Sequence, residues 1–110
     1  PTSTAPEDRS SSVVPARRRL LLFTNAGCLG CQVTKRLVNQ SPRLHEAMKM
    51  WDYELVDTAT DDGASLAARY RVTVVPVLIG YDGSHEVLRT ENIQTEDEIA
   101  HALAQASEPQ

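Results

Sequence analysis

The hydrophobic residues of this chain fall into short runs separated by polar segments. The continuous apolar run at 20–24 is typical of a buried strand, and residues 51–56 and 77–79 also have strand character. The pair Asp82-Gly83 favours a hairpin turn, so residues 86–89 are predicted to form the returning strand. The pattern therefore predicts four strands, the last two joined by a hairpin.

Apolar residues at helical spacing separate these strands. Residues 31–39 form a predicted helix, which Ser41-Pro42 interrupts, and proline suits the first turn of a continuation. Residues 57–63 are predicted to be a polar loop, followed by a short helix at 64–70. The segment 95–98 is a capping box, with threonine as the N-cap and glutamate three residues later, so the last helix should begin there.

The order of these elements predicts an α/β fold with a mixed four-stranded sheet flanked by helices. The first strand–helix–strand unit should join parallel strands through a right-handed crossover, and the hairpin should add antiparallel pairing. A chain of 110 residues fits one domain. We expect that domain at residues 17–107, because residues 1–16 are rich in Ser, Thr and Pro without a hydrophobic period and are predicted to be a disordered tail or linker.

The formal net charge is −4, and the first 19 residues are basic, so the predicted domain is acidic. An acidic domain argues against a nucleic-acid partner, since phosphate binding requires a basic surface. No apolar run approaches the roughly 20 residues of a membrane span. The chain begins at Pro1, so we expect a processed form or a fragment, either cytoplasmic or exported with its signal segment removed. A monomer is expected.

The sequence Cys28-Leu29-Gly30-Cys31 contains the only two cysteines and directly follows the first predicted strand. Two thiols at this spacing can close a disulfide within one helical turn, and the positive end of a helix dipole stabilises a thiolate. A purely structural disulfide would close a trivial loop and contribute little. The motif therefore favours redox chemistry. The N-terminal cysteine of such a pair is expected to be the more exposed one, so Cys28 is the predicted nucleophile.

Metal binding is the alternative use of two cysteines. Two thiolates supply only half of a tetrahedral zinc site, and His45, His85 and His101 do not lie at ligand spacing from the motif. A surface Cu(I) site made of the two soft thiolates alone remains open.

The Cys-x-x-Cys at a strand-to-helix junction, followed by Val75-Pro76 before a strand and Asp82-Gly83 in a hairpin, resembles the thioredoxin superfamily. The resemblance covers residues 18–106. It implies a thioredoxin-like fold and a cis peptide bond at Val75-Pro76. In that family the cis bond exposes backbone that pairs with the substrate chain.

The resemblance also implies a thiol–disulfide oxidoreductase that needs no cofactor and no metal. Cys28 would attack a protein disulfide and Cys31 would resolve the mixed disulfide. Val75 and Pro76 would hold the substrate backbone, while Leu29-Gly30 would set local shape and reduction potential. The implied partners are disulfide-containing protein substrates and an upstream redox protein or thiol donor.

Five departures mark the chain as a divergent thioredoxin-like protein. They are Gly27 in place of the usual Trp, Leu22 in place of a buried acid, Glu54 near the position of that acid's lysine partner, Leu29-Gly30 in place of Gly-Pro, and Glu91-Asn92 near the position of a glycine. The direction of electron flow is therefore open, and an oxidant or isomerase shares these residues. A thioredoxin-fold binding module that carries Cu(I) or docks a partner is the alternative function.

Overall fold

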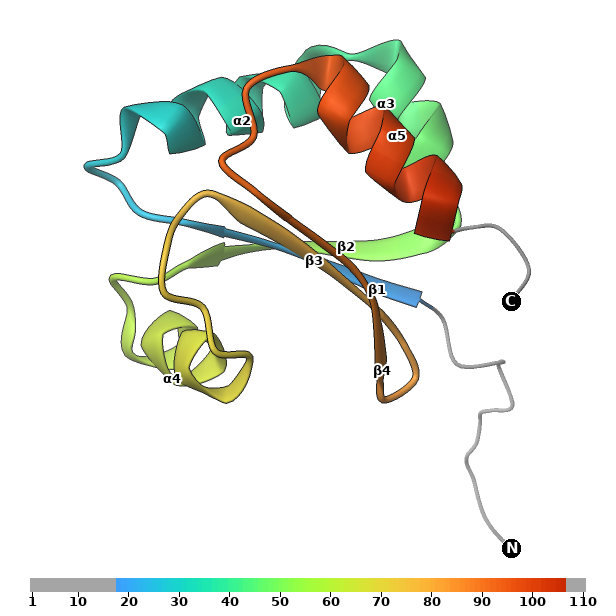
Figure 1. Cartoon of the computed structure of the whole chain (residues 1–110). Helices are drawn as coiled ribbons and strands as arrows, with labels where there is room; N and C mark the ends of the chain where they lie inside the picture. Colours follow the sequence, from blue (N-terminus) through green and yellow to red (C-terminus); the bar gives the residue numbers. More distant parts are fainter. Residues whose placement is uncertain (1–17, 107–110) are drawn as a thin grey trace, which may run out of the picture.

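The computed structural model describes residues 18–106, and in it a central sheet is covered by helices on both faces (Figure 1). The predicted tail at 1–16 and the outer limits of the predicted domain at 17–107 lie outside the described residues, so these boundaries stay predictions. Within the described range, no helix has the length and apolar character needed to cross a membrane.

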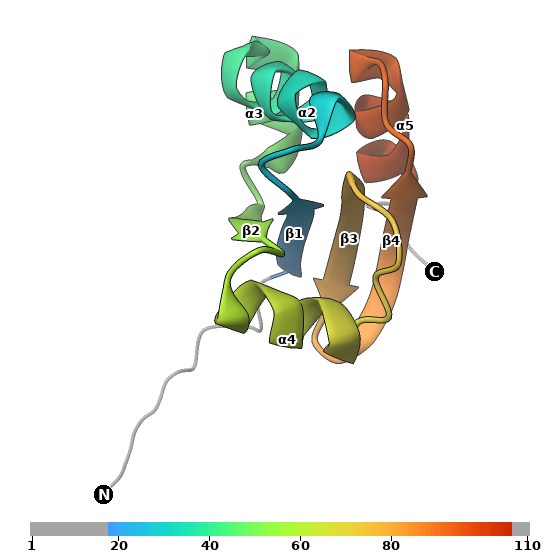
Figure 2. The same cartoon turned by 90° about the vertical axis from the view of Figure 1, so that its left-hand side faces the viewer.

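The sheet has four strands in the order β2-β1-β3-β4, visible side by side in Figure 2. The strands are β1 (Arg18–Thr24), β2 (Trp51–Asp57), β3 (Val77–Asp82) and β4 (His85–Glu91). β1 pairs parallel with β2, whereas β3 runs antiparallel to both β1 and β4. The predicted mixed sheet with its hairpin is thereby confirmed.

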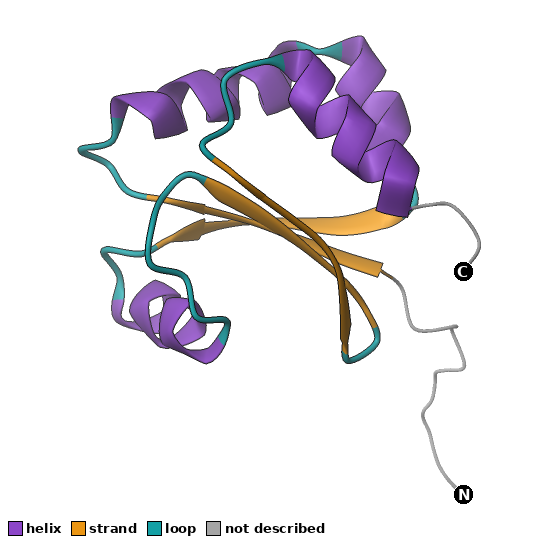
Figure 3. Ribbon diagram, viewed as in Figure 1, coloured by secondary structure: helices purple, strands orange, loops and turns teal. Residues whose placement is uncertain are grey.

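The helices of the described region lie on the two faces of this sheet (Figure 3). They are α2 (Leu29–Gln40), α3 (Pro42–Met48), α4 (Asp61–Arg69) and α5 (Glu96–Ala106). Figure 1 shows α2, α3 and α5 above the sheet and α4 below it. The predicted placement of helices on both faces is correct.

Strand β1 is buried on both faces, which explains its unbroken apolar sequence. Leu20 and Leu22 belong to the core cluster that also includes residues of α2, α3 and α5. Leu21 and Phe23 belong to the second cluster, on the α4 side. All four side chains have no exposed surface, and each such burial contributes about 1.5–3 kcal/mol to folding. The motif that follows β1 therefore extends from a well-fixed strand.

Ser41 separates α2 from α3 and caps the second helix. Its backbone is extended, and its Oγ accepts a hydrogen bond from Leu44 N at 3.1 Å. Pro42 occupies the first helical turn, where it has no hydrogen bond to lose. The predicted interruption at Ser41-Pro42 is confirmed.

Helix α4 begins at Asp61, three residues before the predicted start, so the expected polar loop is shorter than predicted. Thr60 is the N-cap, and its Oγ1 accepts a hydrogen bond from Gly63 N at 2.9 Å. Asp61 and Asp62 lie in the first turn, where carboxylates interact favourably with the helix dipole. A polar stretch that reads as a loop is thus a capped helix start.

Turn chemistry and capping shape the last third of the chain. Gly83 in the β3–β4 hairpin has φ +65°, a conformation that glycine adopts readily. Asn92, directly after β4, has φ 55°, which asparagine tolerates better than most residues. Glu98 N donates to Thr95 Oγ1 at 3.2 Å, and Thr95 N donates to Glu98 Oε1 at 2.8 Å. The predicted capping box is confirmed.

Candidate active site

The loop between β1 and α2 is held by Asn25. The backbone N–H of Cys28 donates to the Asn25 carbonyl at 3.0 Å, and Gly27 N donates to Asn25 Oδ1 at 3.1 Å. The amide of Asn25 also reaches Thr58 Oγ1 at 3.4 Å, and Thr58 Oγ1 donates to Thr24 O at 3.0 Å. Two chain segments therefore fix the direction in which the motif leaves the sheet.

Cys28 is the N-cap residue of α2 and forms a disulfide with Cys31. The Cα atoms are 5.2 Å apart, within the usual range for such a bond, and Cys31 N donates to Cys28 Sγ at 3.0 Å. Cys28 is partly exposed, whereas Cys31 has no exposed surface. Cys28, at the N-terminus of the helix, is therefore the more accessible of the two cysteines.

The peptide bond Val75–Pro76 is cis, as the resemblance implied. Cys28 Sγ lies 3.7 Å from the Val75 carbonyl oxygen. In the disulfide form the sulfur and the carbonyl oxygen are only in contact, because the sulfur carries no proton. The reduced Cys28 thiol could donate a hydrogen bond to this oxygen. A Cβ added to Gly30 would lie 3.4 Å from Pro76 Cδ and 3.9 Å from Cys28 Sγ. The structure thus brings the proline loop and the Cys-x-x-Cys motif into contact.

Leu29 occupies the first position of α2 with 77% of its surface exposed. Two further apolar residues nearby, Val33 on α2 and Val74 beside the cis bond, are 42% and 48% exposed. The sequence pattern did not single them out, because a valine in an apolar stretch normally indicates a buried position. Apolar surface therefore flanks the motif on both the helix and the loop side.

Thr34 is a further residue that the sequence did not reveal. It is fully buried, and its Oγ1 donates to Gly30 O at 3.0 Å and also reaches Ile93 O at 3.4 Å. The only signal was a polar residue on the buried side of a predicted helix. Through this hydroxyl the motif helix is joined to the segment that follows β4.

Leu22, at the position of the family's buried acid, has no exposed surface. Glu54 does not lie on its side of the sheet, because Glu54 is paired in register with Leu21, whose side chain faces α4. The exposed carboxylate accepts a hydrogen bond from Arg19 Nη2 at 3.1 Å. The β2 residues packed on the Leu22 side include Trp51 and Tyr53, and burial raises the pKa of Tyr53 to about 12. The sequence-based placement of Glu54 is therefore wrong.

The described residues offer few donors for a metal ion. Within residues 18–106, no group of three or more His, Cys, Asp or Glu side chains is arranged to hold a metal ion. A Cu(I) site would use only the two thiolates of the motif, and the absence of a group of three donors does not bear on it. The Cu(I) alternative therefore stays a hypothesis.

No family model matches the sequence, and no curated protein matches it either. Solved structures do. A thioredoxin from Thermus thermophilus superposes with a TM-score of 0.71 and 26% sequence identity, over 81% of this chain and 72% of that chain. This chain is a divergent thioredoxin-like protein.

More distant structures show the same thioredoxin-like fold. Thioredoxin O2 from Arabidopsis thaliana, in its oxidised state, has a TM-score of 0.69 and 16% identity over 82% of this chain and 75% of that chain. Thioredoxin f2 from Chlamydomonas reinhardtii has a TM-score of 0.67 and 15% identity over 89% of this chain and 86% of that chain. At such identities the likeness concerns the fold alone.

Proposed function

We propose that this thioredoxin-like protein is a thiol–disulfide oxidoreductase that exchanges electrons with protein disulfides. The observation that carries the proposal is the arrangement of its two cysteines. Cys28 is partly exposed at the N-cap of α2, Cys31 is buried one turn later, and the cis Val75–Pro76 bond lies against them. The reaction needs no small-molecule cofactor.

The first step is nucleophilic attack by the Cys28 thiolate on a substrate disulfide. A bond forms between Cys28 Sγ and one substrate sulfur, while the substrate S–S bond breaks and its second sulfur leaves as a thiolate. The unpaired N–H groups and the positive dipole at the start of α2 stabilise the attacking anion. Cys28 is the nucleophile because it is the accessible member of the pair.

In the second step the Cys31 thiolate attacks Cys28 Sγ. The mixed disulfide breaks, the Cys28–Cys31 disulfide forms, and the substrate leaves with two electrons as two thiolates that take up two protons. The step is intramolecular because both cysteines belong to one chain, and it is fast because they lie close together. A thiol donor or an upstream redox protein then reduces the pair again.

Substrate binding involves the surface around Cys28. The Val75 carbonyl lies beside the sulfur, so an extended substrate backbone held there has its cysteine next to Cys28. Pro76 and Gly30 form the floor between loop and helix. The exposed side chain of Leu29 provides apolar contact for residues that flank the substrate cysteine.

Insulin reduction with dithiothreitol as the electron source tests the proposal. Wild type should accelerate the reduction, and Cys28→Ser should return it to the rate with dithiothreitol alone. Circular dichroism checks that the variant is folded. Wild-type turnover by Cys28→Ser contradicts the assigned nucleophile. Failure of the wild type to accelerate reduction, together with one Cu(I) bound at the thiols, would favour the carrier alternative.

A further inference from the structure

The outward face of α2 carries an exposed stripe that starts beside the reactive sulfur. Leu29 and Val33 are four residues apart, so they are neighbours on one face, and Arg36 continues that face on the next turn. The opposite face of the helix carries Cys31 and Val38, which are buried. All three side chains of the stripe are exposed, so it faces solvent from residue 29 to residue 36.

The stripe ends in a groove between α2 and the start of α5. Its volume is about 400 Å³, and its apolar walls are Val33, Leu37 and Pro42. Two charged residues, Arg36 from α2 and Glu96 from α5, also line it. Such a groove can take one apolar side chain with a polar neighbour.

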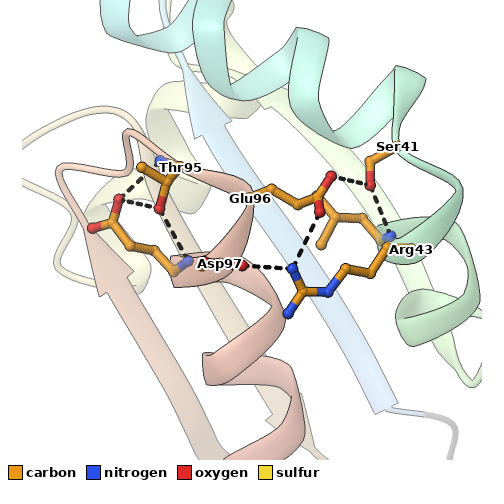
Figure 4. Close-up of polar contacts among 7 residues, drawn as sticks. Ser41, Arg43, Thr95, Glu96 and Asp97 are labelled. Carbon is orange, nitrogen blue, oxygen red and sulfur yellow. Dashed lines mark hydrogen bonds and ion pairs between the residues drawn. The ribbon is translucent and has the colours of Figure 1, made fainter.

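The two charged residues of the groove differ in what they already bind. Figure 4 shows the contacts of Glu96. Glu96 accepts hydrogen bonds from Ser41 Oγ at 2.6 Å and from Arg43 Nη1 at 3.2 Å. These two contacts, the serine bond first, lower the pKa of Glu96. Arg43 also binds Asp97. Arg36, by contrast, forms no ion pair with any carboxylate in residues 18–106, and its guanidinium fork is suited to binding one.

We propose that this groove is a specificity subsite for substrate proteins, which place an apolar side chain against Val33 and Leu37 and a carboxylate on Arg36. The inference rests on the proposed oxidoreductase function and names its substrate class. With a rise of about 1.5 Å per helical residue, Val33 lies about 7.5 Å and Arg36 about 12 Å along α2 from Cys28. An extended substrate advances about 3.3 Å per residue, so the apolar residue is about two and the acidic residue about four positions from its cysteine.

Two peptide disulfides test the subsite. Each is a disulfide-linked dimer of two identical peptides with one cysteine apiece. In the first peptide, Leu stands two residues before and two residues after the cysteine, and Asp stands four residues before and four residues after it. The second peptide has Lys in place of Asp. We expect wild type to reduce the Asp peptide about threefold to tenfold faster in kcat/KM, a preference that falls with added salt.

Charge reversal on α2 provides the matched comparison. Arg36→Glu should abolish or invert the preference for the Asp peptide. Lys35→Glu changes the net charge equally, but Lys35 does not line the groove, so its variant should keep the wild-type preference. Equal reduction of both peptides by wild type overturns the subsite. So does an equal loss of preference in the two variants, because it would show a general charge effect.

A neutral small disulfide separates this proposal from the proposed function. If wild type reduces bis(2-hydroxyethyl) disulfide but does not distinguish the peptides, only the subsite is wrong. If wild type reduces neither the small disulfide nor the peptides, the oxidoreductase function itself fails, and the subsite fails with it.

Discussion

Gly30 and Pro76 pack directly against each other across the candidate active site. A Cβ on residue 30 would lie 3.4 Å from Pro76 Cδ, at the short end of ordinary van der Waals contact. Gly30, the second of the two residues between the cysteines, therefore sets how closely the proline loop approaches α2.

This contact makes Gly30 a sensitive position. Gly30→Ala should raise the free energy of unfolding by about 0.5–1 kcal/mol, because alanine favours the helix and its methyl group fits the available space. Gly30→Val should lose that gain, since its two further methyl groups crowd the proline ring. Urea denaturation of the two variants measures the difference. A lower stability of Gly30→Ala than of wild type would show that the space is smaller than described.

Gly63 is constrained far more severely. A Cβ at this position would lie 1.8 Å from the Asp57 carbonyl oxygen, so the first turn of α4 must move away from the end of β2 to accommodate it. We expect Gly63→Ala to cost more than about 2 kcal/mol, a fall in Tm of roughly 8 °C or more. Gly27→Ala is the control, because its Cβ would meet only Asn25 Oδ1 at 3.8 Å. Equal melting temperatures of the two variants would refute this packing.

Glu98 makes part of the stability depend on pH. Its carboxylate accepts hydrogen bonds from Gln94 N and from Thr95. These bonds, of which the one from Gln94 has the largest effect, lower the pKa of Glu98 from the ordinary value of 4.5. The stabilisation is complete above that ordinary value and is lost as the pH falls through the lowered pKa in the folded state. Glu98→Gln keeps a hydrogen-bond acceptor but does not titrate. The variant should lose less unfolding free energy than wild type between about pH 7 and about pH 3. Identical losses in urea titrations would contradict the assignment.

The strands and most helices could be predicted because their signals are local. The apolar run of β1 and the capping box at Thr95 each depend on neighbouring residues, and the structure confirms both. The start of α4 was misplaced because Asp61 and Asp62 resemble a loop in sequence. Their favourable interaction with the helix N-terminus appears only once Thr60 is seen to cap it.

The candidate site was only partly accessible to sequence reasoning. The motif and Pro76 are recognisable by their type and order. The bond of Thr34 to Ile93 joins residues 59 positions apart, and no local pattern reports it. The face on which Glu54 lies depends on the register between β1 and β2, which the sequence leaves open. Long-range pairing, not local preference, decides these features.

Trapping of the mixed disulfide tests the central claim most directly. Cys31→Ser lacks the resolving thiol, so a disulfide substrate such as insulin should remain covalently bound to Cys28. Mass spectrometry under non-reducing conditions should show this adduct, its release by dithiothreitol and no adduct with Cys28→Ser. Absence of the adduct with reduced, folded Cys31→Ser, or an equal adduct on Cys28→Ser, would contradict the account.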